Sequence, residues 1–141
     1  MKILSAFMIG AVLVGLTGTI FAQDPAYIPE DNEELYGTWI NMEYRSFPFP
    51  KVINYPGDWA AFLSANSEKV HETGKYTIID KWTDSEGNIW YKTKVSGVVQ
   101  KVYQLDKISN SGKTWEFVFS YEKYPTEINP KDADYYIYHR E

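Results

Sequence analysis

The sequence predicts an all-β protein, a small antiparallel up-and-down β-barrel of about eight strands with one short helix. Short runs of β-branched and aromatic residues recur along the chain, separated by glycine, proline, asparagine and aspartate, as in a series of hairpins. The chain has 12 tyrosines, five tryptophans and no cysteine, so we expect an aromatic core and no disulfide. A β-sandwich is the alternative. Barrel closure is favoured because it removes exposed strand edges, and about eight strands enclose space for side chains or one small ligand.

Residues 1–22 are expected to be a secretory signal peptide. Lys2 precedes the apolar run ILSAFMIGAVLVGL, which is shorter than the about 20 residues of a membrane span, and Ala22 occupies a plausible cleavage position. An uncleaved N-terminal anchor is the alternative. No cysteine follows the run, which excludes a lipid anchor of the bacterial lipoprotein kind. We therefore expect a secreted or periplasmic protein, with an acidic leader at residues 23–34 and one barrel domain at residues 35–141.

The composition and motifs argue against several function classes. The formal net charge of −5 disfavours binding to nucleic acid or to an anionic membrane surface. There is no G-x-S-x-G motif, and the two histidines, His71 and His139, are expected to be structural or solvated. The segment DSEGN at residues 84–88 resembles part of a calcium loop, but Val95 stands where the final glutamate is needed, so a hairpin turn is the better account. We expect no enzyme activity, no metal and no cofactor.

The first part of the domain combines strands with the one expected helix. Residues 36–45 are predicted to form the first strand. Three prolines in residues 47–58 exclude a central strand, although residues 51–55 can form a short edge strand. The segment DWAAFLSANSEKV, residues 58–70, has a helical pattern: an aspartate suited to an N-cap, then three apolar residues at i, i+3 and i+4. These apolar residues are Trp59, Phe62 and Leu63. We expect the helix to lie against the barrel mouth.

The clearest hairpin spans residues 75–95, with its turn at residues 84–88. If Thr83 lies opposite Asn88, the side chains of the two strands divide into two faces. The first face carries Tyr76, Ile78, Asp80, Trp82, Ile89, Tyr91, Thr93 and Val95. The second face carries Thr77, Ile79, Lys81, Thr83, Trp90, Lys92 and Lys94. Three lysines indicate that the second face is exposed to solvent, so the first faces the core.

Three more strands complete the predicted barrel. Residues 98–109 form one strand, and residues 109–113 form a second hairpin turn. Residues 113–123 alternate cleanly and place four aromatic side chains inward. These are Trp115, Phe117, Phe119 and Tyr121. A loop with two prolines follows at residues 124–134, and residues 133–141 form the last strand.

Two ends of the chain carry a family resemblance. Gly37-Thr38-Trp39 at the start of the first strand, with Arg140 near the end of the last, resembles the pattern of lipocalins and the wider calycin superfamily. The resemblance implies that Gly37 lets the chain turn tightly into the barrel floor and that Trp39 plugs this floor. It also implies that Arg140 stacks on the indole and bonds nearby carbonyls, a cation–π contact worth roughly 0.5–2 kcal/mol.

The inward position of Asp80 suggests a ligand site. A buried carboxylate is costly without partners, and we hypothesise that Asp80 fixes one polar or cationic group of a ligand. The expected walls of this cavity are Trp82, Tyr91, Tyr103, Phe117 and Phe119. Two alternatives stay open: tyrosine and threonine hydroxyls satisfy Asp80, or a one-residue slip of register places it in solvent.

We therefore predict an exported, non-enzymatic protein that binds a small apolar or aromatic ligand inside the barrel. The alternative is a protein-interaction or structural module of the cell envelope, with a barrel filled by side chains. Its partner surface would be an outward patch of Trp90, Ile79, Tyr136 and Tyr138, unless these residues only form ordinary cross-strand pairs. An internal void large enough for a ligand favours the first class, and a filled barrel favours the second.

Overall fold

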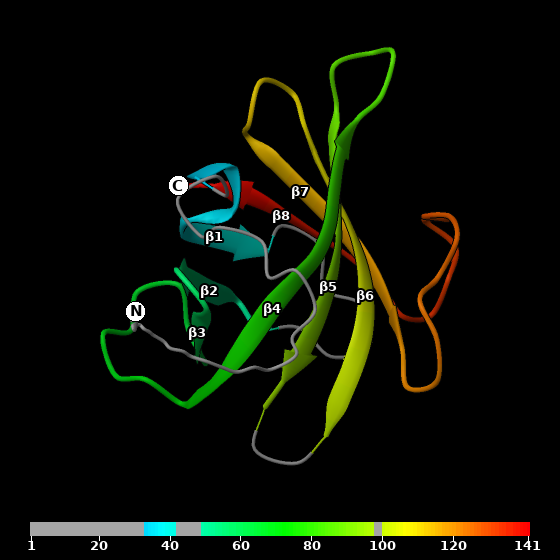
Figure 1. The fold of residues 1–141 in the computed structure, drawn as a ribbon. Coiled ribbons are helices and arrows are strands. Elements are labelled where there is room, and N and C mark those ends of the chain that lie inside the picture. Colours follow the sequence, from blue (N-terminus) through cyan, green and yellow to red (C-terminus); the bar gives the residue numbers. More distant parts are fainter. Residues whose placement is uncertain (1–32, 42–48, 98–99) are drawn as a thin grey trace, which may run out of the picture.

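The short β-branched and aromatic runs form eight strands that close into one antiparallel barrel (Figure 1). The computed structural model describes residues 33–41, 49–97 and 100–141. The strands are β1 (Gly37–Asn41), β2 (Lys51–Tyr55), β3 (Asp58–Phe62), β4 (Glu72–Thr83), β5 (Ile89–Ser96), β6 (Lys101–Ser109), β7 (Thr114–Ser120) and β8 (Tyr135–Arg140). Each strand pairs with the next along the chain, and β8 pairs with β1. The predicted all-β barrel is confirmed, and the sandwich alternative is excluded. The expected signal peptide, residues 1–22, and residues 23–32 of the expected leader lie outside the described residues.

The helix expected at residues 58–70 is wrong, because its first five residues form β3. Gly57, with φ of +79°, closes a tight turn that folds β3 back on β2. In this hairpin Trp59 and Ala61 point into the barrel, while Leu63 lies beyond the strand and is 64% exposed. An isolated helix of two or three turns is marginal, whereas β3 gains hydrogen bonds to strands on both sides. The strand at residues 51–55 is likewise paired on both sides and is no edge strand.

A β-bulge changes the expected register of the β4–β5 hairpin. Near the open end of the hairpin, Tyr76 pairs with Val95, as predicted. An extra residue at Ile79 then shifts the register, so that Thr83 lies opposite Ile89 instead of Asn88. Side chains of β4 beyond the bulge therefore lie on the opposite face from the one expected.

The turn of this hairpin explains the bulge. The Asp84 carboxylate accepts hydrogen bonds from the backbone amides of Glu86 and Asn88, both at 2.9 Å. The backbone amide of Asp84 donates to the carbonyl of Asn88, also at 2.9 Å. These bonds close the loop with Asp84 opposite Asn88, one residue later than expected on the β4 side. The bulge absorbs the difference.

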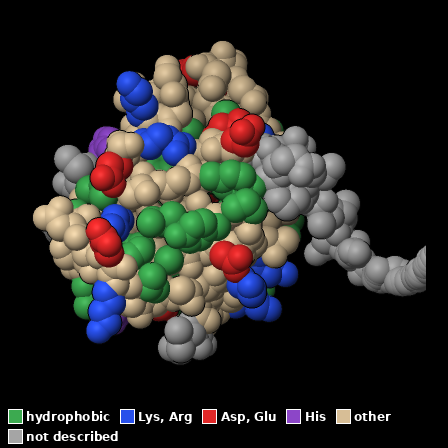
Figure 2. Space-filling view, turned by 90° about the vertical axis from the view of Figure 1, so that its left-hand side faces the viewer, with side chains coloured by type: hydrophobic (Ala, Val, Ile, Leu, Met, Phe, Trp, Pro, Cys, Tyr) green, Lys and Arg blue, Asp and Glu red, His purple; other side chains and the backbone are tan. Residues whose placement is uncertain are grey.

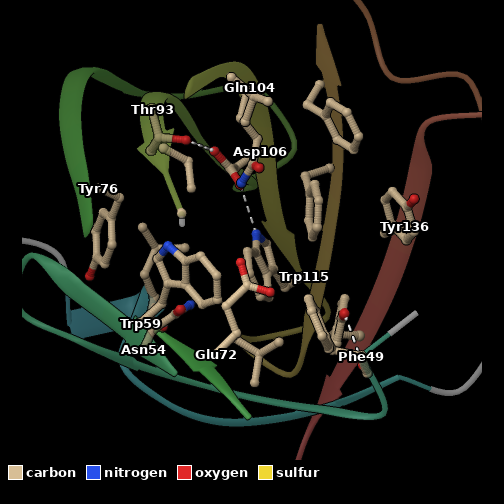
Figure 3. A pocket seen from close by; sticks show the side chains of 18 of the residues that line it. Phe49, Asn54, Trp59, Glu72, Tyr76, Thr93, Gln104, Asp106, Trp115 and Tyr136 are labelled. Carbon is tan, nitrogen blue, oxygen red and sulfur yellow. Dashed lines mark hydrogen bonds between the residues drawn. The ribbon is translucent and has the colours of Figure 1, made fainter. Parts of the chain in front are cut away.

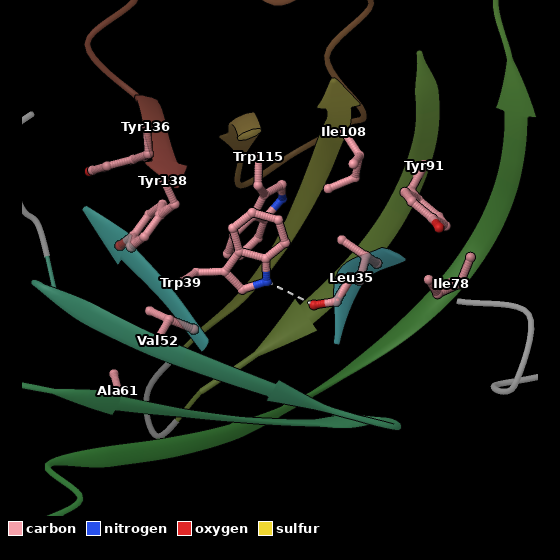
Figure 4. Close-up of a cluster of buried hydrophobic side chains, with 10 residues drawn as sticks. All are labelled: Leu35, Trp39, Val52, Ala61, Ile78, Tyr91, Ile108, Trp115, Tyr136 and Tyr138. Atoms are coloured by element: carbon pink, nitrogen blue, oxygen red, sulfur yellow. Dashed lines mark hydrogen bonds between the residues drawn. The ribbon is translucent and has the colours of Figure 1, made fainter. Parts of the chain in front are cut away.

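The barrel floor is built around Trp39 and Arg140, which are paired across β1 and β8. The indole of Trp39 is fully buried and donates a hydrogen bond to the carbonyl of Leu35 at 2.9 Å (Figure 4). Its ring packs against Trp115 with centroids 5.5 Å apart. The guanidinium of Arg140 lies 4.2 Å from the centroid of the Trp39 ring. The expected stacking of Arg140 on the indole is confirmed.

Backbone carbonyls hold the guanidinium of Arg140 in this position. It donates to the carbonyls of Glu34, Tyr36 and Gly112, the last at 3.0 Å. Gly37 has a φ of +109°, and a Cβ atom built there would lie 2.9 Å from Nη1 of Arg140. Glycine is therefore needed both for the left-handed backbone and for the close approach of the guanidinium.

A second, smaller apolar cluster lies on the outer face of the barrel. Leu105 and Val118 point outward from β6 and β7 but are buried. They pack with Tyr135, together with Ile128 from the connection between β7 and β8. This connection therefore covers part of the sheet, and outward residues there are not all exposed to solvent.

Candidate functional site

The barrel encloses a cavity of about 370 Å³ whose wall is mainly aromatic (Figure 3). Strand alternation brings the inward side chains of β7 to one wall, as predicted from the sequence. Rings from β3, β4 and β8, and Phe49 just before β2, complete the aromatic lining. The aromatic residues that line the cavity are Phe49, Trp59, Tyr76, Trp115, Phe117, Phe119, Tyr121, Tyr136 and Tyr138.

One carboxylate, Asp106, is fully buried in the cavity wall. Its Oδ2 accepts a hydrogen bond from the hydroxyl of Thr93 at 2.7 Å. Its Oδ1 accepts from Nε2 of Gln104 at 2.6 Å and from the indole of Trp115 at 2.9 Å. Burial raises the pKa of Asp106 to about 6, although the three donors partly oppose the rise. Asp106 is therefore mostly ionised at neutral pH, in a site that disfavours its charge.

A close approach of backbone to Trp59 shapes the opposite part of the wall. The indole of Trp59 donates to the carbonyl of Ser96 at 3.2 Å, and its ring lies over Gly74. A Cβ atom at Gly74 would lie 2.1 Å from that carbonyl oxygen and 2.5 Å from the ring. Only glycine allows the indole to lie against the backbone here.

The predicted cavity wall is only partly correct. Phe117 and Phe119 line the cavity as expected. Tyr91 is buried, but its hydroxyl donates to Glu34 at 2.6 Å near the barrel floor, away from the cavity lining. Tyr103 alternates to the outer face of β6, where it packs edge-on against Tyr124 with centroids 5.1 Å apart.

The bulge at Ile79 removes two other predicted residues from the cavity. Asp80 is exposed, and its carboxylate accepts a bond from the next backbone amide. This outcome matches the register-slip alternative. Trp82 points outward and stacks on Trp90, with centroids 6.0 Å apart and planes 6° apart. The aromatic cavity does contain a carboxylate, as expected, but this is Asp106 and not Asp80.

The predicted outward patch is wrong in composition. Tyr136 and Tyr138 are buried and line the cavity, because their pairing with β7 places them beside its inward rings. Ile79 is half-buried at the bulge, and Trp90 is half-buried on the outer face. Trp90 does take part in an outward aromatic contact, which is its stack with Trp82.

Asp106 was not a candidate in the sequence because β6 shows no clear alternation. Leu105 and Asp106 are both buried, one on each face of the strand. The partner strand decides which face is inward: Asp106 pairs with Phe117, whose ring belongs to the inward row of β7. The inward row of β7 could be read from the sequence. Aligning residues 98–109 against that row would therefore have indicated that Asp106 faces inward.

Among the described residues, no group of three or more histidine, cysteine, aspartate or glutamate side chains is arranged to hold a metal ion. His71 is exposed and His139 half-buried. In the same part of the chain, no helix is both long and apolar enough to cross a bilayer. A scan of protein-family models and searches of curated proteins and of solved structures each find no match to this chain.

Proposed function

We propose that this protein is a non-enzymatic binding protein that holds a small, mainly apolar ligand inside the barrel. The observation that carries this proposal is the aromatic cavity of about 370 Å³ with its few polar groups, the usual composition of ligand sites. The volume equals that of about 12 water molecules in the liquid, so a ligand of roughly 12 non-hydrogen atoms fits. Export through the expected signal peptide, to a secreted or periplasmic location, is part of the proposal.

A lipocalin-like classification is also part of the proposal. The stack of Arg140 on Trp39 and the left-handed Gly37 support it, because they reproduce the floor that the resemblance implies. The up-and-down pairing of all eight strands supports it as well.

Native mass spectrometry of the protein purified from its own host tests the proposal directly. We expect a co-purifying molecule of small mass that is released on denaturation. Calorimetric titration with 3-ethylindole, a neutral probe, gives a second test, and we expect saturable binding at one site.

Matched variants locate the probe. Val102 lines the cavity, so Val102→Trp fills it and should abolish binding of 3-ethylindole. Lys101 is exposed on the same strand, so Lys101→Trp adds the same ring outside and should leave binding unchanged. If the host protein carries no molecule and the wild type does not bind the probe, the proposal is wrong.

The second candidate is a protein-interaction module, favoured by the outward stack of Trp82 on Trp90. Trp82 is 38% exposed, and the ammonium of Lys107 lies 5.5 Å from the Trp90 ring. Figure 2 shows one face of the molecule, on which apolar side chains gather in the middle and charged side chains lie around them. If native mass spectrometry finds no small molecule and 3-ethylindole does not bind, the interaction module becomes the preferred function.

A further inference from the structure

The charged side chains that line the cavity are both acidic. They are Asp106 and Glu72, and no lysine or arginine belongs to the described lining. The three partners of Asp106 are neutral donors, whereas the two ion pairs of the described residues use Asp58 and Glu34. The charge of Asp106 is therefore uncompensated by any cation in the described part of the chain.

The side chain of Gln104 presents an acceptor beside this charge. An ionised carboxylate can only accept hydrogen bonds, so the amide nitrogen of Gln104 must face Asp106. The carbonyl oxygen of the same amide is then directed away from Asp106, and it has no hydrogen-bond partner among the described residues. Because Gln104 lines the cavity, this oxygen is available to a donor on a ligand.

The negative charge also acts on a neighbouring wall. Tyr76, on β4, lines the cavity, and its pKa is raised chiefly by burial, with a contribution from the carboxylate of Asp106. The aromatic faces around the cavity add to this preference, because ring faces attract cations. An anionic ligand would be repelled, and a neutral one would leave Asp106 uncompensated.

We propose that the cavity selects a small organic amine in its ammonium form, with the ammonium at Gln104 and Asp106 and an apolar body among the rings of Trp115, Phe117 and Phe119. This inference rests on the proposed binding function and names the class of its ligand. The ammonium donates to the Gln104 carbonyl and lies within the field of Asp106. Pairing inside a site of low dielectric is stronger than in water.

Three probes with one indole body test the inference by calorimetry at neutral pH. They are tryptamine, which is cationic, 3-ethylindole, which is neutral, and indole-3-acetate, which is anionic. We expect tryptamine to bind at least tenfold more tightly than 3-ethylindole, and indole-3-acetate to bind more weakly than both. If 3-ethylindole binds and tryptamine is no tighter, the amine inference fails while the proposed function stands. If none of the three binds and the host protein is empty, both fail.

Two variants assign the preference to Asp106. Asp106→Asn keeps the size of the side chain, and the hydroxyl of Thr93 can rotate to accept from its amide, so Gln104 keeps its orientation. We expect the preference for tryptamine over 3-ethylindole to fall at least tenfold. Asp80→Asn removes an equal charge outside the cavity and should change neither affinity. Unchanged tryptamine preference in Asp106→Asn would overturn the assignment. If that variant does not fold, a crystal structure of the wild type with tryptamine decides, and an ammonium bound at Glu72 instead of at Gln104 and Asp106 contradicts the inference.

Discussion

Replacing Asp106 by asparagine should stabilise the empty protein at neutral pH. Asparagine has nearly the same shape and carries no charge, so it resembles the protonated form of the aspartate. Its side-chain oxygen can accept from the Trp115 indole and from the amide of Gln104, and its own amide can donate to the hydroxyl of Thr93, which rotates to accept. The variant therefore keeps a bonded network and removes only the buried charge.

The magnitude follows from the pKa of Asp106, which burial raises from 3.8 to about 6 in the folded protein. Between these two values the folded state binds more protons than the unfolded state, so this group's contribution to stability falls as pH rises. The contribution is fully present below pH 3.8 and is lost once pH exceeds about 6. At 1.36 kcal/mol for each pKa unit, the charge costs about 3 kcal/mol at neutral pH. We expect Asp106→Asn to recover about 2 kcal/mol of this, because the new hydrogen bonds are weaker than those of a carboxylate.

Urea unfolding followed by tryptophan fluorescence, repeated at intervals from pH 4 to pH 8, measures this effect. The difference between wild type and Asp106→Asn cancels the titration of other groups, and it should grow with pH and level off above pH 7. Asp80→Asn is the control, and its free energy of unfolding should stay within about 0.5 kcal/mol of the wild type. An Asp106→Asn protein that is less stable than the wild type at pH 7.5, or a difference that does not vary with pH, would refute the reasoning.

Two other substitutions test the floor and the cavity wall. Arg140→Ala removes three hydrogen bonds to carbonyls and the cation over Trp39, so the free energy of unfolding should fall by about 3 kcal/mol. Arg140→Lys keeps the charge but loses the forked donors of the guanidinium, so it should lose about half of that. Chemical denaturation measures both free energies of unfolding. Equal losses for the alanine and lysine variants would contradict the role of the guanidinium's forked donors. Gly74→Ala should cost about 3 kcal/mol and change the near-ultraviolet circular dichroism, because the new methyl group collides with the backbone and with Trp59. A loss below about 0.5 kcal/mol would show that this contact is looser than described.

Seven of the eight strands were predicted from the sequence, but the side chains that face inward were predictable only where the alternation is regular. The inward row of β7 follows directly from its period of two, and the contact of Arg140 with Trp39 follows from the resemblance. The segment DWAAF fits a helix and a strand equally well over five residues, and pairing with β2 and β4 decides for the strand. The pattern of residues within the segment carries no information about this pairing with other strands.

An aromatic cavity with a carboxylate was predicted, but of the residues predicted to line it only Phe117 and Phe119 do so. A single bulge residue, Ile79, reverses which side chains at the end of β4 face inward, and this places Asp80 in solvent. The carboxylate that does enter the cavity, Asp106, depends on how β6 pairs with β7, which is a contact between strands and not a property of either one. A shift of one residue in the pairing of β6 with β7 would therefore move Asp106 out of the cavity.

Closure of the barrel depends on its last strand. Every strand except β1 and β8 pairs only with neighbours along the chain, and Arg140 bonds the backbone of Glu34 and Tyr36, more than a hundred positions earlier. As the chain folds, successive hairpins can assemble, but the second edge of β1 stays unpaired until the final residues reach it. A truncated product that stops before β8 would display two unpaired strand margins and an uncovered Trp39, so its principal hazard is aggregation and not reduced affinity.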